Sequence, residues 1–548
     1  MKHLYSVAAL LALAPFTAVS APSAPVAESP ALLPKPNKLT VGTGPGFALT
    51  GALKVQAPAG TVDSALIALK GGLPAGIARS ETDKNSLSIS VDPALGKEAY
   101  NLTITPDGLT LVAGDAAGAF YGAQTLIQAV VKDSAGKPAI PAMTIEDRPR
   151  FAWRGLMLDS CRHFIKTSNV KRMIDVMAMY KFNTLHWHLT EDQGWRIEIK
   201  KYPKLTEIGS VRTESPLIGN RNKGDGKPYG PFFYTQAEIK DIVAYAKARQ
   251  ITIIPEIELP GHAVAAIAAY PDLGNNDLPG FNPKLRTRWG VEDYVYAPKE
   301  ETFKFLDDVI GEVASLFPDA PYIHIGGDEC PKTQWSKSPF AQKVMTDNDL
   351  LTDGKPDPHK LQSWFIRRVE KSINAHGKKL IGWDEIQEGG LSPTATMMVW
   401  RDWKWATEAI KHGNDVVMTP GTHCYLDHAP GNLPKDPAFE TIGGSLTLEK
   451  VYSMNPVPAG LTPEEAKHVI GVQGNLWSEY IFNQPKLEFL AFPRAIALAE
   501  VGWTSEGRDE ADFKKRLEKN LPRLDAMKVN YQKLDGTPAQ PDAKIETE

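Results

Sequence analysis

The spacing of apolar residues changes near residue 150 of the chain. Before that point, apolar residues alternate in short runs such as SLSISV, YNLTITP and GLTLVAG, separated by Gly, Pro and Asp. Alternation at every second position is typical of half-buried strands. The stretch GAFYGAQTLIQAVVK instead places its apolar residues, from Ala119 to Val130, at helical spacing. Residues 37–147 are therefore predicted to form a small α+β domain.

The region from residue 148 to 505 repeats one pattern, an apolar run of strand length followed by an amphipathic stretch. NVKRMIDVMAMYK and KLQSWFIRRVEKSINAHG are two such stretches with helical spacing. Strands alternating with helices over roughly 350 residues predict a (β/α)8 barrel. An open doubly wound sheet is the alternative, and the lack of a Gly-rich phosphate loop disfavours a nucleotide-binding version of it. The eight runs are GLMLDS, FNTLHWHL, ITIIPEIEL, YIHIGGDE, KLIGWDEI, TMMVWRD, DVVMTP and VIGVQGNLW.

The two ends of the chain differ from both regions. Residues 1–20 combine Lys2 with a short apolar run and small residues before Ala21, which is the pattern of a cleaved signal peptide. The run is short for a membrane anchor, the alternative, and no later segment is apolar for long enough to cross a bilayer. Residues 21–36, rich in Ala, Pro and Ser, are predicted to be a linker, and residues 506–548 a C-terminal helix and tail. We therefore expect an exported protein, periplasmic or secreted.

Composition narrows the class of protein. The chain has 548 residues, 42% of them hydrophobic and 23% charged, as in soluble globular proteins. Its net charge of -4 argues against nucleic acid as the main partner. Three cysteines are too few for a disulfide scaffold in an exported chain, and we expect buried thiols. All 12 Trp lie between Trp153 and Trp503, and aromatic faces are surfaces on which sugar rings stack.

Titratable and aromatic residues follow every one of the eight runs. In a (β/α)8 barrel, the carboxyl ends of the strands build the active site. None of the endings supplies a Lys for Schiff-base chemistry. The two histidines of the second run could bind a metal, but no third His has suitable spacing, so a hydrogen-bonding role is favoured. The residues are Asp159, Arg162, His163, His186, His188, Glu191, Asp192, Glu256, Glu258, His262, Asp328, Glu329, Trp383, Asp384, Glu385, Trp400, Arg401, Tyr425, Asp427, Trp477 and Glu479.

Carboxylates combined with Trp point to glycoside hydrolysis. The segments HIGGDE, HWHLTEDQGWR, PEIELPGH and GNLWSEY together resemble the family 20 glycoside hydrolases, the β-N-acetylhexosaminidases, over roughly residues 30–505. The resemblance implies an exo-acting enzyme that releases terminal β-linked N-acetylglucosamine, or N-acetylgalactosamine, from an oligosaccharide or glycoconjugate. It implies a substrate-assisted mechanism in which the 2-acetamido oxygen attacks the anomeric carbon. Glu329 is then the general acid and base, Asp328 holds the acetamido N–H, and Tyr425 binds its carbonyl.

The resemblance also implies binding roles, and no metal or organic cofactor. Asp192 and His262 resemble a polar relay behind Glu329. Arg162, Asp427 and Glu479 match groups that bind sugar hydroxyls, and the aromatic walls match Trp383, Trp400 and Trp477. The chain departs from the family pattern at Glu191 and Glu258, where Asp is common, and in FETIGGSLTLEK, which lacks a Trp found in some members.

The adjacency of Asp328 and Glu329 leads to two expectations. Gly326 and Gly327 are expected to give the backbone the freedom that lets both carboxylates reach one pocket. Because two close carboxylates do not easily ionise together, the pKa of Glu329 is expected to be raised, as suits a general acid. Two rival functions remain at this point, a family member that releases a disaccharide and a non-catalytic glycan-binding barrel.

Overall fold

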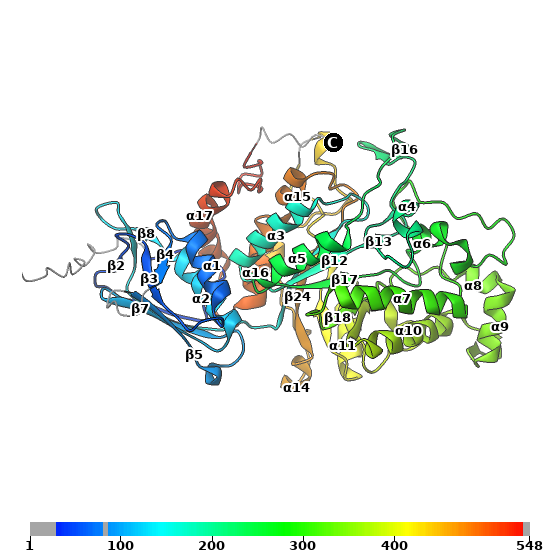
Figure 1. Ribbon diagram of the computed structural model, residues 1–548, viewed down its shortest axis with the longest axis horizontal. Helices are drawn as coiled ribbons and strands as arrows, with labels where there is room; N and C mark the ends of the chain where they lie inside the picture. The colour runs from blue at the N-terminus through cyan, green and yellow to red at the C-terminus, as the bar shows by residue number, and fades with distance from the viewer. Residues whose placement is uncertain (1–28, 80–85, 434, 541–548) are drawn as a thin grey trace, which may run out of the picture.

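The computed structural model describes residues 29–79, 86–433 and 435–540. The expected signal peptide lies outside these residues. Figure 1 shows the N-terminal domain beside a larger barrel, along the long axis of the molecule. Among the helices of the described residues, none is long and apolar enough to span a membrane. Cys161, Cys330 and Cys424 are buried free thiols, as expected.

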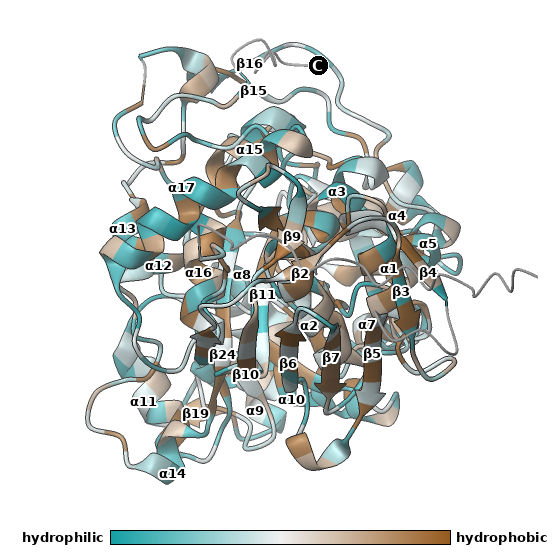
Figure 2. Cartoon of the chain, turned by 90° about the vertical axis from the view of Figure 1, so that its left-hand side faces the viewer, coloured by the Kyte–Doolittle hydropathy of each residue, from teal (hydrophilic) through white to brown (hydrophobic). Residues whose placement is uncertain are grey.

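The N-terminal domain is built on a seven-stranded mixed sheet in the order β1-β10-β6-β7-β5-β3-β4. Along β6, Tyr100, Leu102 and Ile104 are buried while the residues between them are more exposed, so the alternation seen in the sequence points one face inward. Figure 2 shows the apolar colouring of β5 and β7 in this sheet. The strands are β1 (Lys38–Val41), β3 (Leu53–Gln56), β4 (Ile77–Arg79), β5 (Ser86–Val91), β6 (Tyr100–Thr105), β7 (Gly108–Ala113) and β10 (Met143–Asp147).

Two helices, α1 (Asp63–Gly72) and α2 (Ala116–Gln128), pack against each other, and α2 also packs on the sheet. The helix expected to reach Val130 and beyond ends earlier, at Gln128. Val131–Lys132 instead forms β8, which pairs antiparallel with β9 (Pro138–Ile140). Branched valines favour this extended pairing over another helical turn. The predicted α+β architecture is confirmed.

The second domain is a closed barrel of eight parallel strands, and each strand coincides with one of the eight apolar runs. Pairing of the first strand with the last closes the barrel, which confirms the predicted (β/α)8 class and rejects the open sheet. The strands are β11 (Trp153–Asp159), β12 (Thr184–His188), β17 (Thr252–Glu256), β18 (Tyr322–His324), β21 (Lys379–Trp383), β22 (Thr396–Val399), β23 (Val416–Met418) and β24 (Val469–Leu476).

The helical layer is less regular than the strands. Between β21 and β22 the described chain has a short 3₁₀ turn, η3 (Asp384–Gln387), where the repeat predicts an α-helix. The connection is short, and it contains Gly389 and Gly390 in left-handed conformations, which do not suit a helix. The main covering helices are α3 (Thr167–Met179), α5 (Gln236–Lys247), α7 (Glu300–Leu316), α10 (Pro358–Ala375), α11 (Trp403–Lys411) and α16 (Arg494–Trp503).

The end of the expected linker is part of the folded structure. Leu32 and Leu33 are 2% and 1% exposed, and the Leu33 N–H donates to Gln128 Oε1 at 2.9 Å. The C-terminal helix α17 (Glu510–Ala526) packs here too, with Asn520 Nδ2 donating to the Ala31 carbonyl at 3.0 Å. The linker prediction is therefore wrong for this part, because the two leucines bury apolar surface that a free linker leaves in water.

Candidate active site

Residues after the carboxyl ends of the barrel strands enclose a pocket of about 360 Å³. All of the residues to which the family resemblance gives a catalytic or binding role line it, except Asp192 and His262, which lie behind Glu329. The other predicted residues in the lining are Arg162, Asp328, Glu329, Trp383, Trp400, Tyr425, Asp427, Trp477 and Glu479.

Two glycines allow the carboxylates after β18 to share this pocket. Gly326 and Gly327 have φ values of 66° and 88°, in the left-handed region. A Cβ on Gly326 would lie 1.6 Å from Glu258 Oε2, and one on Gly327 would lie 2.5 Å from Ile386 Cγ2. Glu329 itself has a φ of 43°, a strained backbone conformation of the kind that concentrates at functional sites. The chain thus turns sharply at this point.

The two carboxylates occupy different environments. The side chain of Asp328 is 12% exposed and that of Glu329 is 46% exposed. Burial raises the pKa of Asp328 to about 7, and the charges of Glu256 and Glu329 add to this against the opposing effect of His262. The pKa of Glu329 is lowered, first by its interaction with His262. The expectation of a raised Glu329 pKa is therefore wrong for the free enzyme, because the desolvation falls on the deeper residue.

His262 connects both carboxylates to a second acidic pair. Its Nε2 lies 3.5 Å from Glu329 Oε2 and 3.7 Å from Asp328 Oδ2. Its Nδ1 lies 2.8 Å from Glu191 Oε1 and 3.3 Å from Asp192 Oδ2. Burial opposes protonation of His262, but the charge of Glu191 and the contacts with Glu191, Asp192 and Glu329 together outweigh it, and the pKa is raised well above its ordinary value. The predicted relay through Asp192 and His262 is geometrically present, and Glu191, which the sequence did not place in it, makes the closer contact.

Three further charged or acidic residues, Arg162, Asp427 and Glu479, line the pocket. Arg162 is buried, with Nη2 2.8 Å from Glu191 Oε2, and its guanidinium lies over the Trp477 ring. Both carboxylate oxygens of Asp427 and one of Glu479 are buried and have no hydrogen-bond partner among the described residues. Burial raises the pKa of both carboxyls. Buried acceptors without partners are costly, and hydroxyl donors on a bound sugar match them.

Four rings form an aromatic box beside Asp328. Trp383 and Trp477 have ring centroids 5.6 Å apart, and Trp400 stacks on Tyr425 with centroids 5.9 Å apart and an interplanar angle of 26°. Burial, with the charges of Asp427 and Asp328, raises the pKa of Tyr425 well above its ordinary value. The phenol therefore stays protonated and can donate a hydrogen bond into the pocket.

The interior of the barrel beneath the box is polar. Glu256 Oε1 accepts from the Trp383 indole N–H at 2.9 Å and lies 2.9 Å from His324 Nδ1, while its Oε2 lies 2.9 Å from His186 Nε2. His188 lies 3.2 Å from Glu258 through its Nε2. His186 and His188 thus make hydrogen-bonding contacts with carboxylates, as the sequence favoured. The expectation that no third histidine joins them is wrong, because the fold brings His324 beside His186 and Glu256, and these three side chains are close enough to hold a metal ion.

Several lining residues were missed in the sequence. Arg221, Trp289 and Ile442 come from connections between barrel strands that carry no motif, and Tyr480 ends the GNLWSEY segment but was not singled out. Arg221 lies on β16 (Asn220–Gly224), and Trp289 precedes α7. Ile442 comes from the segment that lacks the Trp of some family members, and Tyr480 follows Glu479. Long connections after strands of a barrel were the available signal.

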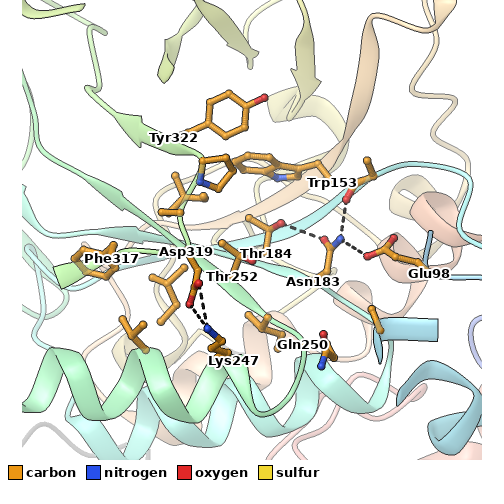
Figure 3. Close-up of a pocket in the computed structure, with 18 of the residues that line it drawn as sticks. Glu98, Trp153, Asn183, Thr184, Lys247, Gln250, Thr252, Phe317, Asp319 and Tyr322 are labelled. Carbon is orange, nitrogen blue, oxygen red and sulfur yellow. Dashed lines mark hydrogen bonds and ion pairs between the residues drawn. The ribbon is translucent and has the colours of Figure 1, made fainter. Parts of the chain in front are cut away.

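A larger cavity, of about 520 Å³, lies at the opposite end of the barrel, where Trp153, Thr184, Thr252 and Tyr322 begin their strands (Figure 3). Its lining carboxylates are engaged: Asp319 pairs with Lys247, and Glu98 accepts from Asn183 at 3.1 Å. By size alone, this cavity would be the preferred candidate for the active site. The titratable groups that converge and the carboxyl oxygens without hydrogen-bond partners, however, belong to the smaller pocket, which lies at the carboxyl end of the barrel. We place the chemistry there.

The fold and the site define a glycoside hydrolase, with a (β/α)8 barrel, a carboxylate pair and an aromatic pocket. The family model described as glycosyl hydrolase family 20, catalytic domain, matches residues 151–506, and that of domain 2 of the same family matches residues 29–148. The chain therefore belongs to glycosyl hydrolase family 20.

Similar proteins agree with this assignment. A β-hexosaminidase of Porphyromonas gingivalis is 47% identical over 462 residues, which cover 82% of this chain and 57% of that protein, so the chain spans little more than half of that relative. One of Vibrio furnissii is 37% identical, over 86% of this chain and 76% of that protein. The solved exo-β-N-acetylglucosaminidase of Vibrio harveyi, in complex with N-acetylglucosamine, has a TM-score of 0.81 at 36% identity, covering 95% of this chain and 81% of that one.

Proposed function

We propose that this protein is an exo-acting β-N-acetylhexosaminidase that removes terminal, non-reducing β-linked N-acetylglucosamine from oligosaccharides by substrate assistance. The observation that carries the proposal is the division between the two adjacent carboxylates. Glu329 lies at the exposed rim, where a leaving group passes, and Asp328 lies buried beside the aromatic box, where an acetamido group packs. One carboxylate thus addresses the bond that breaks, and the other addresses the internal nucleophile.

In the first step, the acetamido oxygen attacks the anomeric carbon. The bond from this carbon to the glycosidic oxygen breaks, and Glu329 gives its proton to that oxygen as the leaving group departs. The product on the enzyme is an oxazolinium ion. Asp328 accepts a hydrogen bond from its N–H and stabilises its positive charge, while the Tyr425 O–H donates to the acetamido oxygen and aims it.

In the second step, Glu329, now a carboxylate, takes a proton from water as the water attacks the anomeric carbon. The oxazolinium ring opens, the acetamido group is restored, and the hemiacetal leaves. Two inversions at the same carbon give net retention of configuration. The enzyme regains a protonated Glu329, so atoms and charges balance over the cycle.

The low pKa of Glu329 in the free enzyme fits this cycle once substrate is bound. A sugar on the acceptor side covers the exposed carboxyl and removes water from it, and desolvation raises the pKa of a carboxyl group. The positive charge that develops at the oxazolinium lowers the pKa of Asp328, which has to be ionised at that stage. Binding thus moves Glu329, and the charge that develops during the reaction moves Asp328, toward the protonation state that the first step requires.

The size of the pocket supports removal of single sugars. About 360 Å³ is near the lower end of the ~300–1,000 Å³ range of small-molecule pockets. The unpartnered acceptors on Asp427 and Glu479 suit the hydroxyls of one terminal ring. This favours release of a monosaccharide over the disaccharide-releasing alternative.

The proposal is tested with three aryl β-glycosides that differ at carbon 2 or carbon 4. We expect efficient hydrolysis of the N-acetylglucosaminide and turnover of the N-acetylgalactosaminide at a lower or similar rate. Replacing the acetamido group by hydroxyl should abolish hydrolysis, because the nucleophile is then absent. NMR of the first product anomer should show the β form. Robust hydrolysis of the plain β-glucoside, or an α product, would refute the mechanism.

We also propose that the protein is exported, on the basis of residues 1–20, which lie outside the described structure. Expression of the full chain with fractionation of the cells should place the mature protein outside the cytoplasm. N-terminal sequencing should show a new start near Ala21. A full-length N-terminus on cytoplasmic protein would contradict this.

A further inference from the structure

Two acidic residues that the proposed reaction does not use, Asp384 and Glu385, directly follow Trp383 at the end of β21. They open η3, the short turn that replaces a barrel helix. Asp384 is fully buried and Glu385 is 4% exposed. Such carboxylates are costly to bury unless they have a defined partner. Their partners both lie directly after the next strand, β22.

The acidic pair holds the end of β22 through several contacts. Asp384 Oδ2 accepts from the backbone N–H groups of Trp400, at 3.1 Å, and Arg401, at 3.0 Å, and its Oδ1 pairs with the Arg401 guanidinium. Glu385 Oε2 accepts from the indole N–H of Trp400 at 3.0 Å. Asp384 therefore fixes the backbone at this point, and Glu385 fixes the direction of one aromatic side chain.

That aromatic side chain is a wall of the pocket. Trp400 is partly buried, lines the pocket and stacks on Tyr425. Without the carboxyl of Glu385, the indole N–H loses its hydrogen-bond partner, and the ring is free to turn about its side-chain bonds. Trp383, the neighbouring wall, is held in the same manner, by Glu256 at 2.9 Å. A buried carboxyl thus sets the orientation of both Trp383 and Trp400.

We propose that Glu385 is a positioning residue that, by holding Trp400, makes the pocket selective for the acetyl group over larger 2-acyl groups. The proposal rests on the proposed function, since it assigns Trp400 to the wall against which the acetyl methyl packs. A fixed wall leaves no room for an additional methylene, because packed interiors do not yield freely. A wall free to turn admits it.

The ionisation of Glu385 is compatible with this role. Burial raises its pKa to about 9, and the charges of Asp328 and Asp384 contribute, against the opposing effect of Arg401, whose Nε lies 3.6 Å from Glu385 Oε1. Near pH 7 the side chain is therefore a neutral acid, whose carbonyl oxygen accepts the indole N–H. It adds no second negative charge beside Asp328. Glutamine offers the same neutral acceptor, which makes Glu385→Gln the conservative variant.

The test compares aryl β-glucosaminides that carry N-acetyl, N-propionyl or N-butyryl groups. Wild type and Glu385→Gln should prefer N-acetyl to N-propionyl strongly, with kcat/KM ratios within about threefold of each other. Glu385→Leu, which keeps the volume and removes the acceptor, should lower that ratio at least tenfold, mainly by losing activity on the N-acetyl substrate. Glu388→Leu is the matched control, because Glu388 closes the same turn but pairs with Lys332 outside the pocket. It should leave the ratio unchanged.

Coupling to the indole separates positioning from general support of the fold. Trp400→Phe removes the N–H, so it should lower the ratio in a similar way, and adding Glu385→Leu to it should change the ratio by less than twofold. If Glu385→Leu lowers kcat/KM equally for all acyl groups, or if its effect persists unchanged in the Trp400→Phe background, the proposal is wrong. If Glu385→Leu does not fold, the ratio for Trp400→Phe decides, and a wild-type ratio there would overturn the proposal. If instead the proposed function is wrong, the wild-type enzyme should hydrolyse plain β-glucosides, an outcome that differs from all of those above.

Discussion

Replacing Asp328 by asparagine is expected to stabilise the protein in a way that grows with pH. In the folded state the pKa of Asp328 is about 7, against an ordinary value of 3.8. Since the folded-state pKa is raised, ionisation costs the folded state more than the unfolded state. The cost is nearly absent at pH 4, develops as the pH rises above 3.8 and is complete above about 7. An asparagine side chain does not ionise, so Asp328→Asn avoids the cost.

The size of the effect follows from the pKa difference. Three units correspond to about 4 kcal/mol at roughly 1.4 kcal/mol per unit. Asp328 and Glu385 repel each other when both are ionised. The two carboxyls therefore titrate together, and a proton held by Glu385 reduces the cost of ionising Asp328. We expect the stability gain of the variant to increase by about 2–4 kcal/mol between pH 4 and pH 8. Asp328 Oδ1 has no hydrogen-bond partner among the described residues, so few contacts are lost.

Urea unfolding and calorimetry at pH 4, 6 and 8 measure the effect. The melting temperatures of wild type and Asp328→Asn should nearly coincide at pH 4, and that of the variant should be several degrees higher at pH 8. Glu329→Gln is the matched control. Its carboxyl has a lowered pKa and is about half exposed, so its effect should be small and opposite in sign. A gain that is the same at pH 4 and pH 8, or a loss at pH 8, would refute the reasoning.

Four further predictions concern activity. Glu329→Gln should lower kcat on chitobiose by about 10²–10⁴-fold, but should affect an aryl glycoside with a good leaving group much less, because that group needs little protonation; equal losses would argue against an acid role. Tyr425→Phe should lower kcat by about 10²–10³-fold in steady-state assays, and an unchanged kcat would remove it from the mechanism. Asp427→Asn should lower kcat/KM by about 2–12-fold, as expected for a hydrogen bond to a neutral acid, because burial raises the pKa of Asp427, and a 4-deoxy or 6-deoxy substrate that lacks the bonded hydroxyl should show no further loss. For wild type, kcat/KM should be level between the pKa values of Glu329 and Asp328 and should fall as the pH rises above about 7, because the reactive free enzyme carries one proton on the pair; in Asp328→Asn the fall should begin at the lower pKa of Glu329.

Most of the site could be predicted from the sequence because the barrel topology brings the ends of the strands together. Trp383, Trp400 and Trp477 are far apart in the chain, yet each lies at the end of a strand run, and a barrel brings the carboxyl ends of all strands to one face. The residues missed for the pocket, such as Trp289 and Ile442, come from long connections with no periodic signal. Their place depends on how each loop packs over the barrel.

The sequence by itself determined the eight strands, the positions of the carboxylates and the need for Gly326 and Gly327. Each of these rests on local patterns, namely side-chain alternation and the backbone freedom of glycine. Only the tertiary structure decided which of the two carboxyls has a raised pKa. The sequence led us to expect Glu329, but it is Asp328. The reason is that desolvation and charge come from side chains elsewhere in the chain, such as Glu256 at the end of β17 and His262 after it, and the spacing of residues within one segment does not specify their distances from Asp328.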